Sequence, residues 1–239
     1  MDFPARLLDV QQRIDAACRL HGKDPATIHL LAVSKTFPAS AVKEALAAGL
    51  HAFGENYVQE GIEKIQQLMA HRQNINWHFI GPLQSNKTKD VAEHFDWMHS
   101  VDREKIARRL SEQRPKGMPA LQVCLQINVS GESTKSGINP SEAPALAAAI
   151  AQLPGLCLRG LMAIPEPTED VLIQRKSFSE LAQLFTSIRQ QLTPDAQANF
   201  NTLSMGMSAD LESAIAESLP QVTTMVRIGT ALFGQRTTK

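Results

Sequence analysis

The stretch Ile28-His29-Leu30-Leu31-Ala32-Val33-Ser34-Lys35 is an apolar run that ends in a lysine. Thr36, Phe37 and Pro38 then break the pattern, because proline has no backbone N–H to donate to a sheet. The run predicts a buried strand over residues 28–35 with an amine at its carboxyl end, where α/β folds place their chemistry.

Lys35 has two interpretations. A free lysine amine has a pKa of about 10.4, and burial beside apolar walls lowers that pKa and gives a nucleophile that reacts with aldehydes. The alternative is a lysine whose long side chain simply reaches solvent from the strand end. The segment 28–35 alone does not distinguish the reactive lysine from the solvent-exposed one.

Seven more strand-like segments follow the first, and helix-like segments alternate with them. The further strands are predicted at 50–55, 76–81, 96–101, 121–129, 156–163, 201–205 and 224–228. Helical patterns cover 4–21, 57–70, 103–113 with Asp102 as its N-cap, 141–153, 171–192 and 210–217.

This alternation is typical of parallel βαβ units, and eight of them in 239 residues predict a single (β/α)8 TIM barrel domain over 1–239. Only five residues follow Gly234, which leaves no room for an eighth helix there. We therefore expect the extra N-terminal helix at 4–21 to close the ring. Periodicity alone leaves an open doubly wound sheet as the alternative.

Charge and composition exclude several classes of function. Lys and Arg number 24, as do Asp and Glu, and no basic block is interleaved with aromatics, so a nucleic-acid surface is not supported. No apolar run approaches the roughly 20 residues that span a membrane, and the amino terminus shows no secretory signal. The three scattered cysteines have no metal-ligand spacing. We expect a cytoplasmic protein with reduced thiols, and a monomer, since nothing in the sequence demands a dimer.

Two loops near the carboxyl terminus could bind an oxyanion. Ser204-Met205-Gly206-Met207-Ser208-Ala209-Asp210 is a turn of mostly small residues that opens a helix, and Gly229-Thr230 follows the last predicted strand. TIM barrels often bind phosphate at the loops after strands 7 and 8. Ordinary helix capping by Ser208 or Asp210 is the alternative for the first loop.

Arg227 lies inside the apolar strand 224–228 and needs an acceptor there, because a buried guanidinium cannot neutralise itself. A carboxylate in a structural ion pair is one candidate, and a ligand is the other. Arg159 is in a similar position, and we expect it to be structural. A lysine amine, a phosphate site and a partner for a ring nitrogen together are what pyridoxal 5′-phosphate (PLP) requires.

Other residues receive structural interpretations. Trp77 and His78 in the third strand are expected to pack in the core. Met162 and Met205 could form walls for a flat ring, although methionine is also common core filler. The charges of Glu63-Lys64 and of Arg103-Glu104-Lys105 are expected on solvated helix faces.

The ordered motifs of the chain resemble those of the pyridoxal phosphate homeostasis protein family over about residues 28–234. The matching stretches are Leu31-Ala32-Val33-Ser34-Lys35-Thr36, Phe53-Gly54-Glu55-Asn56-Tyr57-Val58-Gln59-Glu60, Trp77-His78-Phe79-Ile80-Gly81-Pro82-Leu83-Gln84-Ser85-Asn86-Lys87, Lys135-Ser136-Gly137, Arg159-Gly160-Leu161-Met162-Ala163-Ile164, Leu203-Ser204-Met205-Gly206-Met207-Ser208 and Val226-Arg227-Ile228-Gly229-Thr230.

The resemblance implies a barrel like the N-terminal domain of alanine racemase, with PLP held as an imine by Lys35. It further implies Asn56 near the ring, Arg227 facing the pyridine nitrogen, and phosphate contacts from Ser208, Gly229 and Thr230, with Ser204 as a further candidate. Met205 joins these as a candidate wall of the cofactor site. Such proteins bind PLP and take part in vitamin B6 homeostasis, with PLP-dependent apoenzymes as candidate recipients, and have no established turnover.

The sequence departs from the family pattern at one position: Phe37 stands where a second lysine often follows the imine lysine by two residues. Any relay of PLP through that position is therefore in doubt, and Lys135 is left as a candidate secondary amine.

We expect no efficient racemisation. A cationic arginine at the ring nitrogen makes the cofactor a weaker electron sink, and two-base racemisation needs an acid/base on the opposite face. The sequence has one tyrosine, Tyr57, and we expect no second domain that could supply another base. The alternatives are a monomeric PLP-dependent racemase or lyase that uses Tyr57, His78 or Lys135 as second base, and a barrel that binds a phosphorylated metabolite without an imine.

Overall fold

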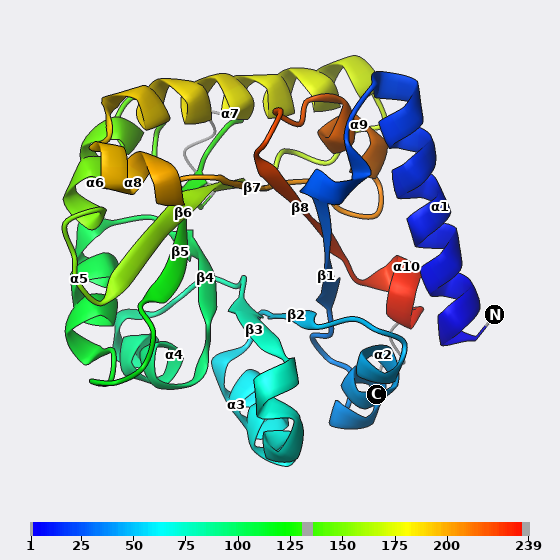
Figure 1. The fold of residues 1–239 in the computed structure, drawn as a ribbon, viewed down its shortest axis with the longest axis horizontal. Helices are drawn as coiled ribbons and strands as arrows, with labels where there is room; N and C mark the ends of the chain where they lie inside the picture. The colour runs from blue at the N-terminus through cyan, green and yellow to red at the C-terminus, as the bar shows by residue number, and fades with distance from the viewer. Residues whose placement is uncertain (1, 131–135, 236–239) are drawn as a thin grey trace.

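Eight parallel strands form a closed barrel in the computed structural model, which describes residues 2–130 and 136–235 (Figure 1). The strands occur in sequence order around the barrel: β1 (Ile28–Val33), β2 (Ala52–Glu55), β3 (Asn76–Phe79), β4 (Trp97–Val101), β5 (Leu121–Ile127), β6 (Leu156–Ala163), β7 (Thr202–Ser204) and β8 (Thr223–Ile228). Pairing of β1 with β8, in which Leu31 is opposite Arg227, closes the ring. The (β/α)8 barrel is therefore confirmed, and the open doubly wound sheet is excluded.

Helices surround the barrel, and every predicted helix is present with shifted ends. They are α1 (Phe3–His21), α2 (Ala39–Ala47), α3 (Val58–Gln67), α4 (Thr88–His94), α5 (Glu104–Gln113), α6 (Ala143–Ile150), α7 (Val171–Gln191), α8 (Pro194–Asn199), α9 (Leu211–Ala216) and α10 (Thr230–Phe233), with short 3-10 turns η1 (Pro25–Thr27), η2 (Met69–Asn74) and η3 (Ser85–Lys87). The sequence left no room for a helix after β8, but α10 forms a single turn there.

Helix α1 covers the seam between the last and the first strands, as predicted. The carboxylate of Asp2 accepts a hydrogen bond from the N–H of Ala5 at the start of the helix, and Gly22 ends it in the left-handed conformation. A buried stripe that includes Leu7, Val10 and Ile14 faces the barrel. Figure 1 shows α1 beside α9 and α10, the two short helices that flank β8, so α1 takes the place of a full-length helix at this seam.

Two apolar clusters lie on the two sides of the strands. The large cluster fills the space between barrel and helices, and it includes Trp77 and Phe79 from β3. The small one consists of Leu31, Val33, Ile80 and Met225. Since alternate residues of a strand point to opposite faces, His78 between Trp77 and Phe79 points into the barrel.

Two sequence predictions about charged residues are wrong. The N-cap of α5 is Arg103 rather than Asp102, and no side chain caps that helix end. Lys64 does not lie on a solvated face of α3: it is only 4% exposed, because the helix turns this residue toward the carboxyl ends of β1 and β2, where acceptors surround its amine.

In the described parts of the chain, no helix is both long and apolar enough to cross a membrane. The same residues contain no group of His, Cys, Asp and Glu side chains that could hold a metal ion.

Candidate functional site

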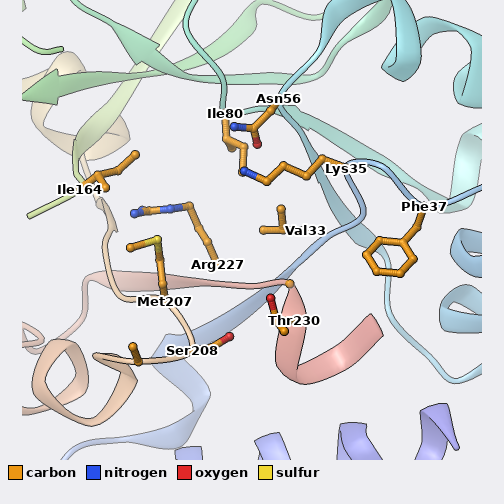
Figure 2. A pocket seen from close by; sticks show the side chains of 12 residues that line it. Val33, Lys35, Phe37, Asn56, Ile80, Ile164, Met207, Ser208, Arg227 and Thr230 are labelled. Carbon is orange, nitrogen blue, oxygen red and sulfur yellow. The ribbon is translucent and has the colours of Figure 1, made fainter. Parts of the chain in front are cut away.

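A cavity of about 310 Å³ opens at the carboxyl ends of the strands, where the sequence predicts the site (Figure 2). Six of the eight predicted site residues line it: Lys35, Asn56, Ser208, Arg227, Gly229 and Thr230. The other lining residues are Val33, Phe37, Ile80, Ile164, Met207 and Ala209. The lining residues lie at the ends of six strands or in the loops that follow them. Barrel closure brings these segments of β1, β2, β3, β6, β7 and β8 to one place.

Lys35 follows β1 by two residues and extends across the mouth of the barrel toward Asn56 (Figure 2). Val33 and Ile80 provide apolar walls beside it. The lysine is half-buried rather than enclosed. Its amine is thus directed into the cavity and remains within reach of a ligand from solvent.

Asn56 provides a polar group that lacks a partner. Its side-chain oxygen is buried and has no hydrogen bond among the described residues. The backbone at Asn56 packs against Gly81, where an added Cβ would lie 2.1 Å from the Asn56 carbonyl oxygen, so only glycine fits at residue 81. A buried acceptor without a donor is costly, so this oxygen is available to a donor that enters the cavity.

Arg227 is buried beneath the cavity and is held by neutral acceptors. Its guanidinium donates to Ser204 Oγ at 2.8 Å and to the carbonyl of Ala163 at 2.9 Å. Burial lowers the pKa of Arg227 to about 10, and the carboxylate of Asp210 opposes this shift. The group therefore stays charged at neutral pH. A structural ion pair with a carboxylate is one of the two alternatives for Arg227 in the sequence analysis. The structure instead shows these two hydrogen bonds and a longer-range attraction to Asp210.

A chain of buried polar groups continues from Arg227, and sequence reasoning missed it. Ser204 Oγ lies 2.7 Å from His99 Nδ1, and His99 Nε2 lies 2.9 Å from His78 Nδ1. Burial lowers the pKa of His78 to about 3, and burial together with His78 and Arg227 holds the pKa of His99 well below its usual value. Both imidazoles are neutral at pH 7, and they fix Ser204 and through it Arg227. The sequence does contain a signal for this chain of polar groups: β3 and β4 are neighbours, and each has a histidine, His78 or His99, that points into the barrel.

The loop after β7 brings Ser208 to the cavity through a turn that requires glycine. Gly206 has a φ of 87°, and an added Cβ would lie 2.6 Å from the Cβ of Ala214. The N–H of Met207 donates to Asp210 Oδ1 at 2.5 Å and tightens the turn. Burial raises the pKa of this carboxyl group, although the bond from Met207 and the charge of Arg227 lower it in part.

Ser204 and Met205 do not line the cavity. Ser204 is fully buried below it as the acceptor for Arg227, and Met205 is fully buried in the core between strands and helices. Met207, two residues later, forms the apolar wall that the sequence assigned to Met205. Met162 is buried and also absent from the wall.

The hydroxyl groups of Ser208 and Thr230 lie close to one another on one wall of the cavity (Figure 2). Gly229 continues this wall from the end of β8. The helices that follow, α9 and α10, have only six and four residues. Local hydroxyl and backbone donors, rather than a long helix dipole, therefore make this wall suitable for an anion.

Phe37 lies on the cavity side of its loop and packs against Phe233 of α10, with ring centroids 5.2 Å apart. This aromatic contact connects the loop after Lys35 with the helix that begins at Thr230. Residue 37, where the family resemblance predicts a second lysine, is therefore an apolar contact in this chain.

Two candidate second bases are poorly placed for proton transfer. Tyr57 is 55% exposed and does not line the cavity. His78 is enclosed in the barrel and paired with His99. Lys135, the third candidate, lies outside the described residues. Arg159 is held by Asn201 and lies over the Trp97 ring, away from the cavity, in agreement with its expected structural role.

Comparison with known proteins agrees with this geometry. The family model for the alanine racemase N-terminal domain matches residues 9–237. A pyridoxal phosphate homeostasis protein of Pseudomonas aeruginosa is 58% identical over 227 residues, which is 95% of this chain and 93% of that protein. Another, of Haemophilus influenzae, is 55% identical over 99% of this chain and 97% of its own length.

The solved structure of PipY from Synechococcus elongatus with PLP bound is 36% identical, has a TM-score of 0.79, and covers 93% of this chain and 100% of its own. The chain therefore belongs to the alanine racemase N-terminal domain family and to the pyridoxal phosphate homeostasis proteins.

Proposed function

We propose that this protein binds PLP reversibly as an imine of Lys35 and takes part in PLP homeostasis. The observation that carries the proposal is the cavity itself, which brings a lysine amine, a buried arginine and a wall of hydroxyl groups within one small volume. Relatives that are named for PLP homeostasis, and PipY solved with PLP bound, support it.

The residues of the cavity fit the chemical groups of PLP. Asn56 has a buried side-chain oxygen without a donor, and the charged Arg227 suits an unprotonated ring nitrogen. Ser208, Gly229 and Thr230 would hold the phosphate, with Met207 and Ile164 beside the ring. When bound, PLP would supply an aldehyde carbon with which the Lys35 amine could form a carbon–nitrogen double bond, with release of one water molecule.

Two features of the site favour binding over turnover. Arg227 disfavours protonation of the ring nitrogen and so weakens the ring as an electron sink. Tyr57 and His78, the second bases that the structure describes, do not line the cavity. We therefore propose a cofactor-binding protein without efficient racemase or lyase activity.

We further propose that one barrel domain over residues 1–239 acts as a monomer in the cytoplasm and that PLP-dependent apoenzymes receive the cofactor. The barrel is closed within one chain, and residues of that chain line the cavity. Light scattering behind a sizing column tests the monomer, with a mass of 26.2 kDa expected. A stable dimer would contradict it.

The visible absorption spectrum of the purified protein, before and after added PLP, tests the central proposal. We expect an imine band with the unaltered protein and its loss in Lys35→Ala, while Lys23→Ala, which changes a lysine remote from the cavity, keeps the band. A barrel that binds a phosphorylated metabolite without an imine would show no such band in either protein.

An assay of amino-acid stereoinversion separates binding from catalysis. We expect no turnover above background from the PLP-loaded protein. Clear turnover that Lys35→Ala abolishes would instead establish the racemase alternative.

A further inference from the structure

A second lysine, Lys64, lies close to Lys35 in the fold but has a different environment. It is only 4% exposed and does not line the cavity. Its amine donates to the carbonyl of Ser34 at 2.7 Å, to Glu55 Oε1 at 2.8 Å and to Glu60 Oε1 at 2.6 Å. These three bonds use all three donors of an ammonium group, so Lys64 is a structural cation and not a candidate nucleophile.

We call Ser34, Glu55, Glu60 and Lys64 the Lys64 cluster. Within it, Ser34 Oγ also donates to Glu55 Oε1 at 2.6 Å. Burial raises the pKa of Glu55, and the charge of Lys64 acts in the opposite direction. The cluster thus contains one cation and two carboxylates at the carboxyl ends of β1 and β2, with Glu55 fully buried.

The Lys64 cluster holds the two peptide groups that flank Lys35. The Ser34 carbonyl belongs to the peptide group before Lys35, and it accepts from Lys64. The Thr36 N–H belongs to the peptide group after Lys35, and it donates to Glu60 Oε1 at 2.5 Å. Because two fixed peptide planes determine where a Cα–Cβ bond points, the cluster sets the direction in which the Lys35 side chain leaves the backbone.

The backbone at this point needs such support. Thr36 has a φ of 67°, in the left-handed region that a β-branched residue rarely adopts. Such a conformation costs on the order of 1–3 kcal/mol and persists only where neighbouring contacts hold it. Two hydrogen bonds hold it: the N–H of Phe37 donates to the carbonyl of Ser34 at 3.1 Å, and Thr36 donates to Glu60, the only one of the two that involves a side chain.

We propose that Glu55, Glu60 and Lys64 are positioning residues for Lys35, which hold its amine in the orientation that condenses with the cofactor aldehyde. This inference rests on the proposed function, since it concerns how Lys35 reacts with PLP. Catalysis and covalent bond formation depend steeply on such orientation, and a displacement of about 1 Å can cost a factor of about 100 in rate.

Glu60 is the residue to change, because removal of Lys64 would leave the Glu55 carboxylate buried and unpaired and would damage the fold. Glu60→Ala removes the acceptor for Thr36 from a side chain that is partly exposed. Glu60→Gln keeps an oxygen in the same place. Glu63→Ala removes an exposed carboxylate from the same helix and is the matched control.

The experiment measures two constants for each protein: the rate of imine formation after mixing with PLP, and the dissociation constant of pyridoxine 5′-phosphate, an alcohol that cannot form an imine. We expect Glu60→Ala to slow imine formation by more than about threefold, with an unchanged dissociation constant for the alcohol. Glu60→Gln and Glu63→Ala should both stay within about threefold of the unaltered rate.

A rate for Glu60→Ala within threefold of the unaltered protein overturns the inference, and so does an equal loss of affinity for the alcohol, which would indicate general damage to the cavity. Equal slowing by Glu63→Ala overturns it as well. These results leave the proposed function intact, whereas the absence of any imine in the unaltered protein would refute both.

Discussion

The two buried histidines predict a specific sensitivity to acid. The pKa of His78 is lowered to about 3 in the folded protein, whereas an exposed histidine in the unfolded chain titrates near 6.5. A base with a lowered folded pKa contributes full stability above its unfolded pKa and loses it as the pH falls toward the folded value. The relevant window is therefore about pH 6.5 down to about pH 3.

The magnitude follows from the two pKa values. Between about pH 7.5 and pH 5, the unfolded chain binds a proton at residue 78 and the folded protein does not, which lowers the free energy of unfolding by about 2 kcal/mol. His99, whose pKa is lowered by the same burial, adds a loss of the same sign. Glu55 and Asp210 have raised pKa values and change the stability in the opposite direction, so the total slope does not isolate the histidines.

The contribution of His78 is isolated by comparing the acid-induced loss of unfolding free energy between the unaltered protein and a variant. Urea unfolding at both pH values gives the free energy of unfolding for the unaltered protein and for His78→Gln, whose amide can still accept a hydrogen bond from His99. We expect the acid-induced loss to be smaller in His78→Gln by about 2 kcal/mol. His29→Gln, which changes an exposed histidine of β1, should leave that loss unchanged. An equal loss in His78→Gln and the unaltered protein would refute the assignment of His78 as a buried neutral base.

Three more predictions concern single residues. Arg227→Gln should fold and bind PLP at least about tenfold more weakly, because charged hydrogen bonds contribute about 1.5–3 kcal/mol. Unchanged PLP affinity in an equilibrium titration would contradict the proposal that Arg227 faces the pyridine nitrogen. Gly206→Ala should lower the free energy of unfolding by about 1–3 kcal/mol, because its Cβ would lie 2.6 Å from that of Ala214, and a urea midpoint equal to the unaltered one would show that the turn adapts. Burial raises the pKa of Cys124 to about 12, so this thiol should react slowly. Thiol labelling of the native protein at pH 8, followed by peptide mapping, should therefore modify the half-exposed Cys157 first. Faster labelling of Cys124 would indicate an open barrel.

Most of the barrel could be predicted from the sequence because apolar runs and breaker residues mark the strands. The predicted strand over 156–163 is observed with the same ends, and the shifted ends of the other strands differ by one or two residues. Barrel closure then places residues that follow different strands at one mouth. This is why the sequence predicts Lys35 and Arg227 in one site without knowledge of the distance between them, whereas Asn56 is predicted there by the family resemblance.

The errors occurred where a side chain's direction depends on a turn or on another element. Met205 and Met207 are two residues apart, and the left-handed turn at Gly206 decides which of them faces the cavity. The sequence pattern of α3 predicts Lys64 in solvent, because it does not show the Ser34 carbonyl and the Glu55 carboxylate that the ends of β1 and β2 bring to the amine. Contacts between distant segments determine both cases.

Borohydride reduction of the PLP-loaded protein, followed by peptide mass spectrometry, tests the central claim most directly. It fixes the cofactor to the amine that holds it, and peptide mapping distinguishes Lys35 from Lys64, the neighbouring lysine near the carboxyl ends of β1 and β2. We predict a pyridoxyl adduct on Lys35 and an unmodified Lys64, since the amine of Lys64 is buried and already bonded to three acceptors. An unmodified Lys35, or an adduct mainly on another lysine, would contradict the account.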